Sequence, residues 1–201
     1  MPKTLTRKVL LSAALIGVTA SIAGLGTYAT FTDTTAASLP VDSGIVDINL
    51  GAVGADNRLT VAATDIVPGD TMQRAFKLSN ASTDTMASIT LTTSASTTSL
   101  LDTDATAGLQ MVIDKCSVAW VEVGVSPAFT YTCAGTTTSV LASRAVIGST
   151  LALSNLTLTA GATDNLRLTL TFPSTTGNTF QNLASTIVYT FTGTQRAAGS
   201  E

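Results

Sequence analysis

Apolar and polar residues alternate with a period of two in several separate segments, and this alternation constrains the fold more than any other feature. It is clearest in "LRLTLTF", residues 166–172, where leucines and a phenylalanine alternate with an arginine and threonines. Such a pattern is typical of a β-strand with one face on a core and the other toward solvent. We therefore expect strands at residues 43–50, 72–80, 87–93, 109–114, 166–172 and 185–193.

The alternation also predicts which side chains of the last two segments reach the core. In residues 166–172, Arg167, Thr169 and Thr171 should face outward. The residues expected to point inward are Leu166, Leu168, Leu170, Phe172, Ile187, Tyr189 and Phe191.

Turn-forming residues separate the strand segments. They occur at Pro68-Gly69-Asp70, Ser79-Asn80, Thr97-Thr98-Ser99, Gly135, Gly148, Gly161 and Pro173 to Gly177. Beyond the N-terminal region, no segment of about 12 residues has a helical pattern. Many short strands with regular turns favour an all-β fold. We predict a single antiparallel β-sandwich of the jelly-roll or immunoglobulin-like type.

The N-terminal region has the three-part pattern of a secretory signal. "MPKTLTRK" carries three basic residues and no acid, residues 9–26 are uncharged, and small residues follow. We predict a signal helix that is cleaved between Ala29 and Thr30. A retained anchor is the alternative, because the uncharged run approaches the ~20 apolar residues of a membrane span. The chain would be tethered to the membrane before cleavage and secreted after it.

These features divide the chain into four parts. Residues 1–29 are the predicted signal peptide, and residues 30–42 form an extended N-terminal segment. Residues 43–195 form the predicted sandwich domain, and residues 196–201 are a C-terminal tail.

The charge of the chain argues against nucleic acid as a partner. Cleavage would leave seven of the ten basic residues against 13 acidic ones, a net charge of −6. Nucleic-acid binding needs several Lys or Arg contacts on one face, and here the basic residues are scattered singly.

The two cysteines, Cys116 and Cys133, predict one disulfide in an exported chain. The stretch between them, "CSVAWVEVGVSPAFTYTC", indicates two strands with a turn at Ser126-Pro127, so the bond would hold a hairpin. A zinc site is the alternative, but the sequence has neither histidine nor a CxxC pair. We expect Trp120 to pack against the disulfide rather than to stack on a ligand.

The sequence offers little for catalysis. It contains no histidine, which excludes a Ser-His-Asp triad, a Cys-His pair and the HExxH zinc motif. Asp102 and Asp104 in "LLDTDATAG" are close together, and we interpret them as solvated turn residues rather than a catalytic or calcium site. We predict that the protein is not an enzyme, with no catalytic residue, metal site or cofactor.

Four segments, in order, resemble the TasA and camelysin family of bacterial exported proteins. They are "GLGTYATFTDT", "SGIVDINL", "IVPGDTMQRAFKLSNASTDTMASITL" and "NTFQNLASTIVYTFTGTQR". The resemblance covers both ends of the chain well and residues 95–160 poorly. It implies a jelly-roll-like sandwich, processing by a dedicated SipW-type signal peptidase, and assembly into extracellular fibres of a biofilm matrix.

The resemblance also implies how subunits join. The N-terminal segment freed by cleavage would add as a strand to the sheet of the next subunit, with main-chain hydrogen bonds supplying affinity. The residues of this donor segment would be Phe31, Asp33, Leu39 and Val41. Relatives called camelysin are also labelled metalloproteases, an activity that a chain without histidine does not inherit.

We therefore expect a secreted structural subunit at the cell surface or in the matrix. Its partners would be itself as a homopolymer, the signal peptidase during export, and other matrix proteins or polysaccharide as further candidates. The alternative is a monomeric cell-surface module for adhesion or polysaccharide binding.

Overall fold

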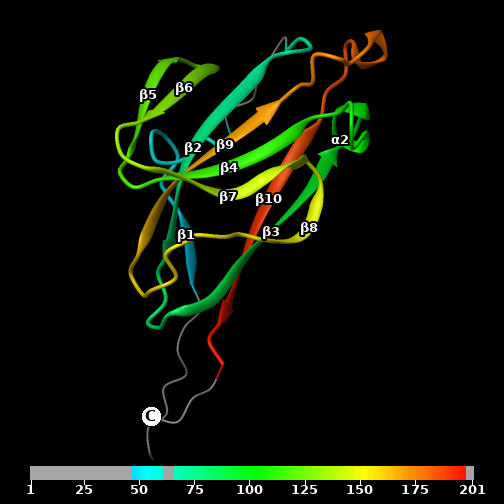
Figure 1. Ribbon diagram of the computed structural model, residues 1–201. Coiled ribbons are helices and arrows are strands. Elements are labelled where there is room, and N and C mark those ends of the chain that lie inside the picture. The colour runs from blue at the N-terminus through cyan, green and yellow to red at the C-terminus, as the bar shows by residue number, and fades with distance from the viewer. Residues whose placement is uncertain (1–46, 61–65, 198–201) are drawn as a thin grey trace, which may run out of the picture. The chain divides into compact units, whose positions relative to one another are not determined.

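Antiparallel β-strands make up nearly all the regular structure in residues 47–60 and 66–197, which this computed structural model describes (Figure 1). The strands are β1 (Ile48–Leu50), β2 (Thr71–Asn80), β3 (Met86–Thr97), β4 (Gln110–Cys116), β5 (Trp120–Val125), β6 (Ala128–Cys133), β7 (Thr137–Ala145), β8 (Gly148–Ala152), β9 (Thr163–Thr171) and β10 (Thr186–Gln195). Two short helical turns, α2 (Leu100–Thr103) and η1 (Asn178–Phe180), interrupt them. The described residues belong to the unit Gly44–Glu201, and the unit Met1–Ser43 lies outside the described part.

Two sheets face each other around one core, so the predicted all-β sandwich is confirmed. One has five strands in the order β1-β2-β9-β4-β7, and the other has three in the order β10-β3-β8. All pairs are antiparallel. The core between the sheets is aliphatic and aromatic, and its most buried members include Phe76, Leu91, Met111, Ile113, Val140 and Leu166. No helix within the described ranges is long and apolar enough to cross a membrane.

The predicted alternation in β9 and β10 is confirmed. In β9, Leu166, Leu168 and Leu170 are almost fully buried, as is Phe172 just after it. In β10, Ile187, Tyr189 and Phe191 are half-buried and pack against the same core, while the residues between them are exposed. The period of two therefore predicts both the strand and its inner face.

Two strands, β7 and β8, lie where the sequence pattern predicts none. In β7, the consecutive residues Val140 and Leu141 are both buried, which breaks the alternation. The register explains this: Ile113 faces Leu141 and Asp114 faces Ser139, so Val140 is the extra residue of a bulge. The turn predicted at Gly148 is wrong, because Gly148 is the first residue of β8.

The third sheet is the hairpin of β5 and β6, which covers the outer face of the five-stranded sheet (Figure 1). Phe129 and Tyr131 of β6 bury Ala75 of β2 in a second apolar cluster, against which Trp120 packs. Arg167 points away from the main core, as predicted, but the hairpin covers it. The second cluster, not the disulfide alone, is thus the packing partner of Trp120.

Candidate functional site

The edge of β10 is the feature of the described structure most suited to binding another chain. β10 pairs with β3 over its whole length, from Thr186 opposite Thr97 to Gln195 opposite Met86. Within the described ranges, no strand pairs with its other side. An unpaired strand edge presents backbone N–H and C=O groups that can accept a further strand.

β10 lacks the devices by which proteins usually block an edge. Its sequence, "TIVYTFTGTQ", has no charged residue and no proline. Its register shifts lie only near its two ends, at Thr186/Ile187 and Thr194/Gln195, so the eight residues between them form a regular ladder. Charges, prolines and central bulges are what normally prevents edge-to-edge pairing. We call residues 187–194 of this strand the β10 edge.

Apolar side chains line the core side of the β10 edge without being fully covered. Phe191 packs against Phe76, with ring centroids 5.5 Å apart. Burial raises the pKa of Tyr189. Near the C-terminal end of the strand, a Cβ at Gly193 would lie 2.7 Å from Ile48 Cδ1, so glycine there allows β1 to approach closely. A strand added beside β10 would cover the apolar side chains that are still half-exposed.

The five-stranded sheet contains a buried arginine. Arg74 of β2 is only 2 % exposed, lies on the core-facing side of the strand, and donates from Nη1 to the Gln73 carbonyl at 2.6 Å. Burial lowers the pKa of the Arg74 guanidinium. Arg74 shares this side of β2 with Phe76 and Leu78, although an arginine is rarely so fully buried.

The predicted disulfide is present. Cys116 ends β4 and Cys133 ends β6, and their Cα atoms are 5.7 Å apart. The turn at Ser126-Pro127 is confirmed between β5 and β6. The other predicted site residues lie outside the described residues: Ala29, Thr30, Phe31, Asp33, Leu39 and Val41.

Further contacts hold the hairpin together and fix it on the sheet. Arg58 donates two hydrogen bonds to Glu122, Nη2 to Oε1 at 2.8 Å and Nε to Oε2 at 3.0 Å, and Tyr131 Oη donates to Glu122 at 2.7 Å. These bonds lower the pKa of Glu122, with Arg58 the larger cause. Arg167 lies over the ring of Trp120 at 4.3 Å, and Trp120 Nε1 donates to the Asn165 carbonyl.

Asp102 is a buried capping residue rather than the solvated turn residue that the sequence predicts. It is 5 % exposed and accepts hydrogen bonds from the Ser99 amide and from the hydroxyls of Thr98 and Ser185. Burial acts to raise its pKa, but these three donors together lower it. Asp104 is a turn residue, as expected, and accepts from the amides of Thr106 and Ala107.

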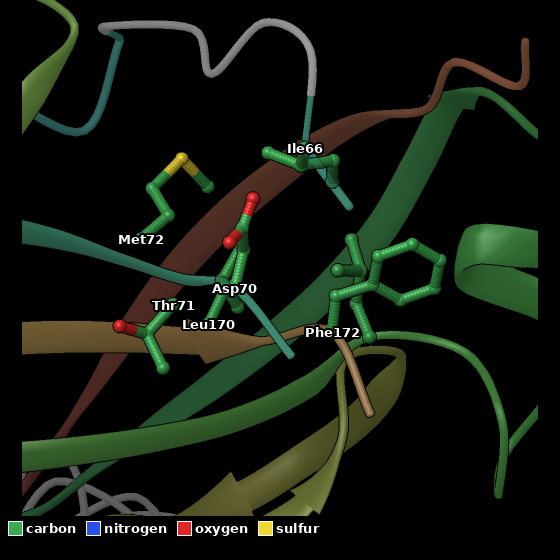
Figure 2. Close-up of a pocket in the computed structure, with 7 residues that line it drawn as sticks. Ile66, Asp70, Thr71, Met72, Leu170 and Phe172 are labelled. Atoms are coloured by element: carbon green, nitrogen blue, oxygen red, sulfur yellow. The ribbon is translucent and has the colours of Figure 1, made fainter. Parts of the chain in front are cut away.

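The cavities of the described structure do not favour a small-molecule site. The cavity in Figure 2, between Ile66, Met72, Leu170 and Phe172, measures about 10 Å³, which is room for about one water molecule. A wider trough of about 540 Å³ lies beside α2 and β3, lined by Thr93, Thr98, Asp102 and other small residues. Its lining has no aromatic ring on which a sugar could stack, and the Asp102 oxygens in it are already occupied.

Both cysteines and four of the described acids, which could otherwise ligate a metal, are engaged in other bonds. Both cysteines are joined in the disulfide, and the sequence contains no histidine. Four acids are paired with cations: Asp56 with Lys77, Asp114 with Arg167, Glu122 with Arg58 and Asp164 with Lys115. Within the described ranges, no three His, Cys, Asp or Glu side chains lie close enough together to hold a metal ion. These residues do not fit a catalytic metal.

Comparison with known proteins gives one family. The family model described as camelysin metallo-endopeptidase matches residues 4–200, nearly the whole chain. A search of curated proteins found no match.

Proposed function

Because the chain belongs to the camelysin metallo-endopeptidase family, we propose that it is a secreted structural subunit of a bacterial surface or biofilm matrix. In this proposal, subunits polymerise after signal cleavage between Ala29 and Thr30. Residues 30–42 of one subunit add as a strand to the β10 edge of the next. The observation that carries the proposal is the long uncharged edge of β10, which has no strand beside it in the described ranges.

The donor segment and the β10 edge are compatible in chemistry. The segment contains the acids Asp33 and Asp42 but no basic residue, and its apolar residues are Phe31, Leu39 and Val41. These three could cover the half-buried side chains of β10, while main-chain hydrogen bonds would extend the three-stranded sheet by one strand.

The family is named for a metallo-endopeptidase, but we propose that this chain does not act as one. A zinc peptidase needs ligands and a general base, and the described cysteines and paired acids leave no such group. We expect that the purified chain does not cleave a protein substrate, with or without a strong chelator, and that the chelator does not change its melting temperature. Chelator-sensitive cleavage by the purified chain would contradict this.

The first experiment compares purified chains that begin at Thr30 and at Ser43 by electron microscopy. We expect fibres from the longer chain only, because the shorter one lacks the donor segment. Monodisperse particles from both chains would contradict assembly and favour the alternative, a monomeric binding module.

A second experiment tests the acceptor. Thr190 and Thr192 are exposed on β10, so a Thr190→Glu, Thr192→Glu variant should fold normally. Glutamates there would repel the acidic donor segment, and like charges on neighbouring strands destabilise pairing. We expect this variant of the chain from Thr30 to form no fibres.

The matched control is Ser88→Glu with Thr90→Glu, which places the same charge on the same sheet but on the central strand β3. We expect the control to form fibres and both variants to melt within a few degrees of the original chain. Full fibre yield from the β10 variant would rule out the β10 edge as acceptor, and strand donation would then need another edge.

A further inference from the structure

The β5–β6 hairpin presents valines to solvent at successive outward positions. Val121, Val123 and Val125 of β5 are 49 %, 55 % and 78 % exposed. They lie opposite Thr132, Thr130 and Ala128 of β6, which are also exposed. We call these six residues the valine face. It carries no charge, although the chain as a whole is acidic.

The valine face departs from the way this chain builds its other exposed strand surfaces. On β10, four of the five outward positions from 186 to 194 are threonine, and the fifth is Val188. Threonine keeps the β-branched shape that suits a strand and adds a hydroxyl for water. Of the eight large hydrophobic side chains exposed in the described ranges, four lie between residues 118 and 125. Gathered on one hairpin in this way, they differ from the singly scattered apolar residues that are normal on a protein surface.

The structure also holds the valine face in a fixed position. The disulfide closes the base of the hairpin, the Arg58–Glu122 ion pair fixes β5, and Arg167 packs against Trp120 beneath it. A surface that is already ordered loses less entropy on binding than a mobile one.

The size of the valine face indicates what kind of contact it can make. A six-residue strand is about 20 Å long and two strands are about 10 Å wide, so the face covers about 200 Å². Stable interfaces bury about 800 Å² per partner. One pair of such faces would therefore dissociate readily, and only many faces in an array would hold.

We propose that the valine face is a self-association surface, which binds the same face of a second copy of this chain and so joins arrayed subunits side by side. A second copy offers an uncharged, flat, β-branched surface of the same size, and two sheets can pack face to face. The proposed function supplies the fibre as the natural array. The contact between two valine faces does not depend on that proposal.

The test uses an artificial array. The chain from Thr30 is given a C-terminal histidine tag and bound to vesicles with nickel-chelating lipids; the chain has no histidine of its own, so only the tag binds. Clustering of the vesicles is followed by turbidity for the original chain, a Val121→Thr, Val123→Thr, Val125→Thr variant and a Val188→Thr control. Val188 is similarly exposed, at 43 %, but lies on β10.

We expect the original chain and the Val188→Thr control to cluster vesicles, and the triple variant to cluster them about tenfold less or not at all, because avidity multiplies each weak contact. Trp120 fluorescence should be the same in all three, which shows that the hairpin is intact. Equal clustering by the triple variant, or none by the original chain, would overturn the inference.

The outcomes separate this inference from the proposed function. If the chain that begins at Thr30 clusters vesicles but forms no fibres, self-association through the valine face is supported and the proposed fibre is contradicted. Fibres that form while vesicles stay dispersed would support the proposed function and contradict self-association through the valine face.

Discussion

At the scale of single residues, the most informative side chains are carboxylates that the fold has buried or half-buried and fixed by several donors. Asp102 is fixed by donors from Thr98, Ser99 and Ser185, the last of which is 83 residues away in sequence. Glu122 is fixed in the same way by Arg58 and Tyr131. Two of the Asp102 donors lie only three and four residues before it, but Ser185 and Arg58 come from distant segments, so the sequence around Asp102 and Glu122 does not reveal the whole network.

Replacing Asp102 by alanine should destabilise the protein. The variant leaves the half-buried Ser99 amide and Ser185 hydroxyl without their acceptor, and an unsatisfied buried group costs about 1–3 kcal/mol. We expect a loss of about 2 kcal/mol or more in the free energy of unfolding, measured with urea. Asp104→Ala, at an exposed turn, is the matched control and should cost less. Equal losses would show that burial of Asp102 is not decisive.

Tyr131 should make stability depend on alkaline pH. Burial, and then the hydrogen bond to Glu122, raise the pKa of Tyr131 from 10.0 to about 12. The unfolded chain therefore loses this proton at a lower pH than the folded one, so the stabilisation is complete below pH 10 and disappears as the pH rises toward about 12. Tyr131→Phe has no such proton.

We expect the stability difference between the original chain and Tyr131→Phe to shrink across that pH range, measured by urea unfolding. Because lysines titrate equally in both proteins, their effect cancels in the difference. A difference that stays constant with pH would mean that Tyr131 ionises normally.

At the scale of strands and hairpins, prediction from the sequence succeeds where alternation is regular and fails where it is not. β9 and β10 are predicted with their inner faces because leucine or aromatic residues occur at every second position. β7 is missed because a bulge buries Val140 and Leu141 together. That β10 is an edge depends on sheet order, and its sequence gives no local sign of it, because β10 has neither the charges nor the prolines that usually mark an edge strand.

The position of the hairpin could not be predicted for a similar reason. Its two strands and its disulfide are evident in the sequence, but the groups that hold it down are remote. Arg58 is 64 residues from Glu122, and Asn165 is 45 residues from Trp120. Only the pairing of β2, β9 and β4 brings these partners together.

Removing the disulfide by Cys116→Ser with Cys133→Ser should loosen the hairpin more than the sandwich. The bond closes a loop between residues 17 apart, which stabilises by about 3 kcal/mol in the loop-entropy view. Trp120 is the one tryptophan of the sequence and lies against Arg167, so its emission reports the hairpin alone. We expect a red shift and a lower urea midpoint. Unchanged emission would show that the ion pair and the second cluster suffice.

At the scale of the whole sandwich, the two proposed contact surfaces lie on different sheets. The β10 edge belongs to the three-stranded sheet, whereas the valine face covers the outer side of the five-stranded one. Binding at one therefore leaves the other exposed. A polymer that grows through the first could associate with its neighbours through the second.

The donor segment should contribute to assembly and not to the stability of the subunit. We expect Phe31→Asp with Leu39→Asp, in the chain from Thr30, to abolish fibres seen by electron microscopy while the melting temperature stays nearly unchanged. The control, Thr34→Ser with Thr35→Ser, alters the same segment without adding charge and should form fibres. Intact fibres from the aspartate variant would contradict donation through these residues.

The pairing of β2 with β9 has a consequence for how such a chain is made. Thr71 faces Thr171, so β2 pairs with a strand that is synthesised about a hundred residues later. The same holds for β3 and its partner β10. Sheets built from such distant pairs fold slowly, since a long loop must close before any contact is gained. The β2–β9 and β3–β10 pairs of this topology can therefore form only after most of the chain has been synthesised.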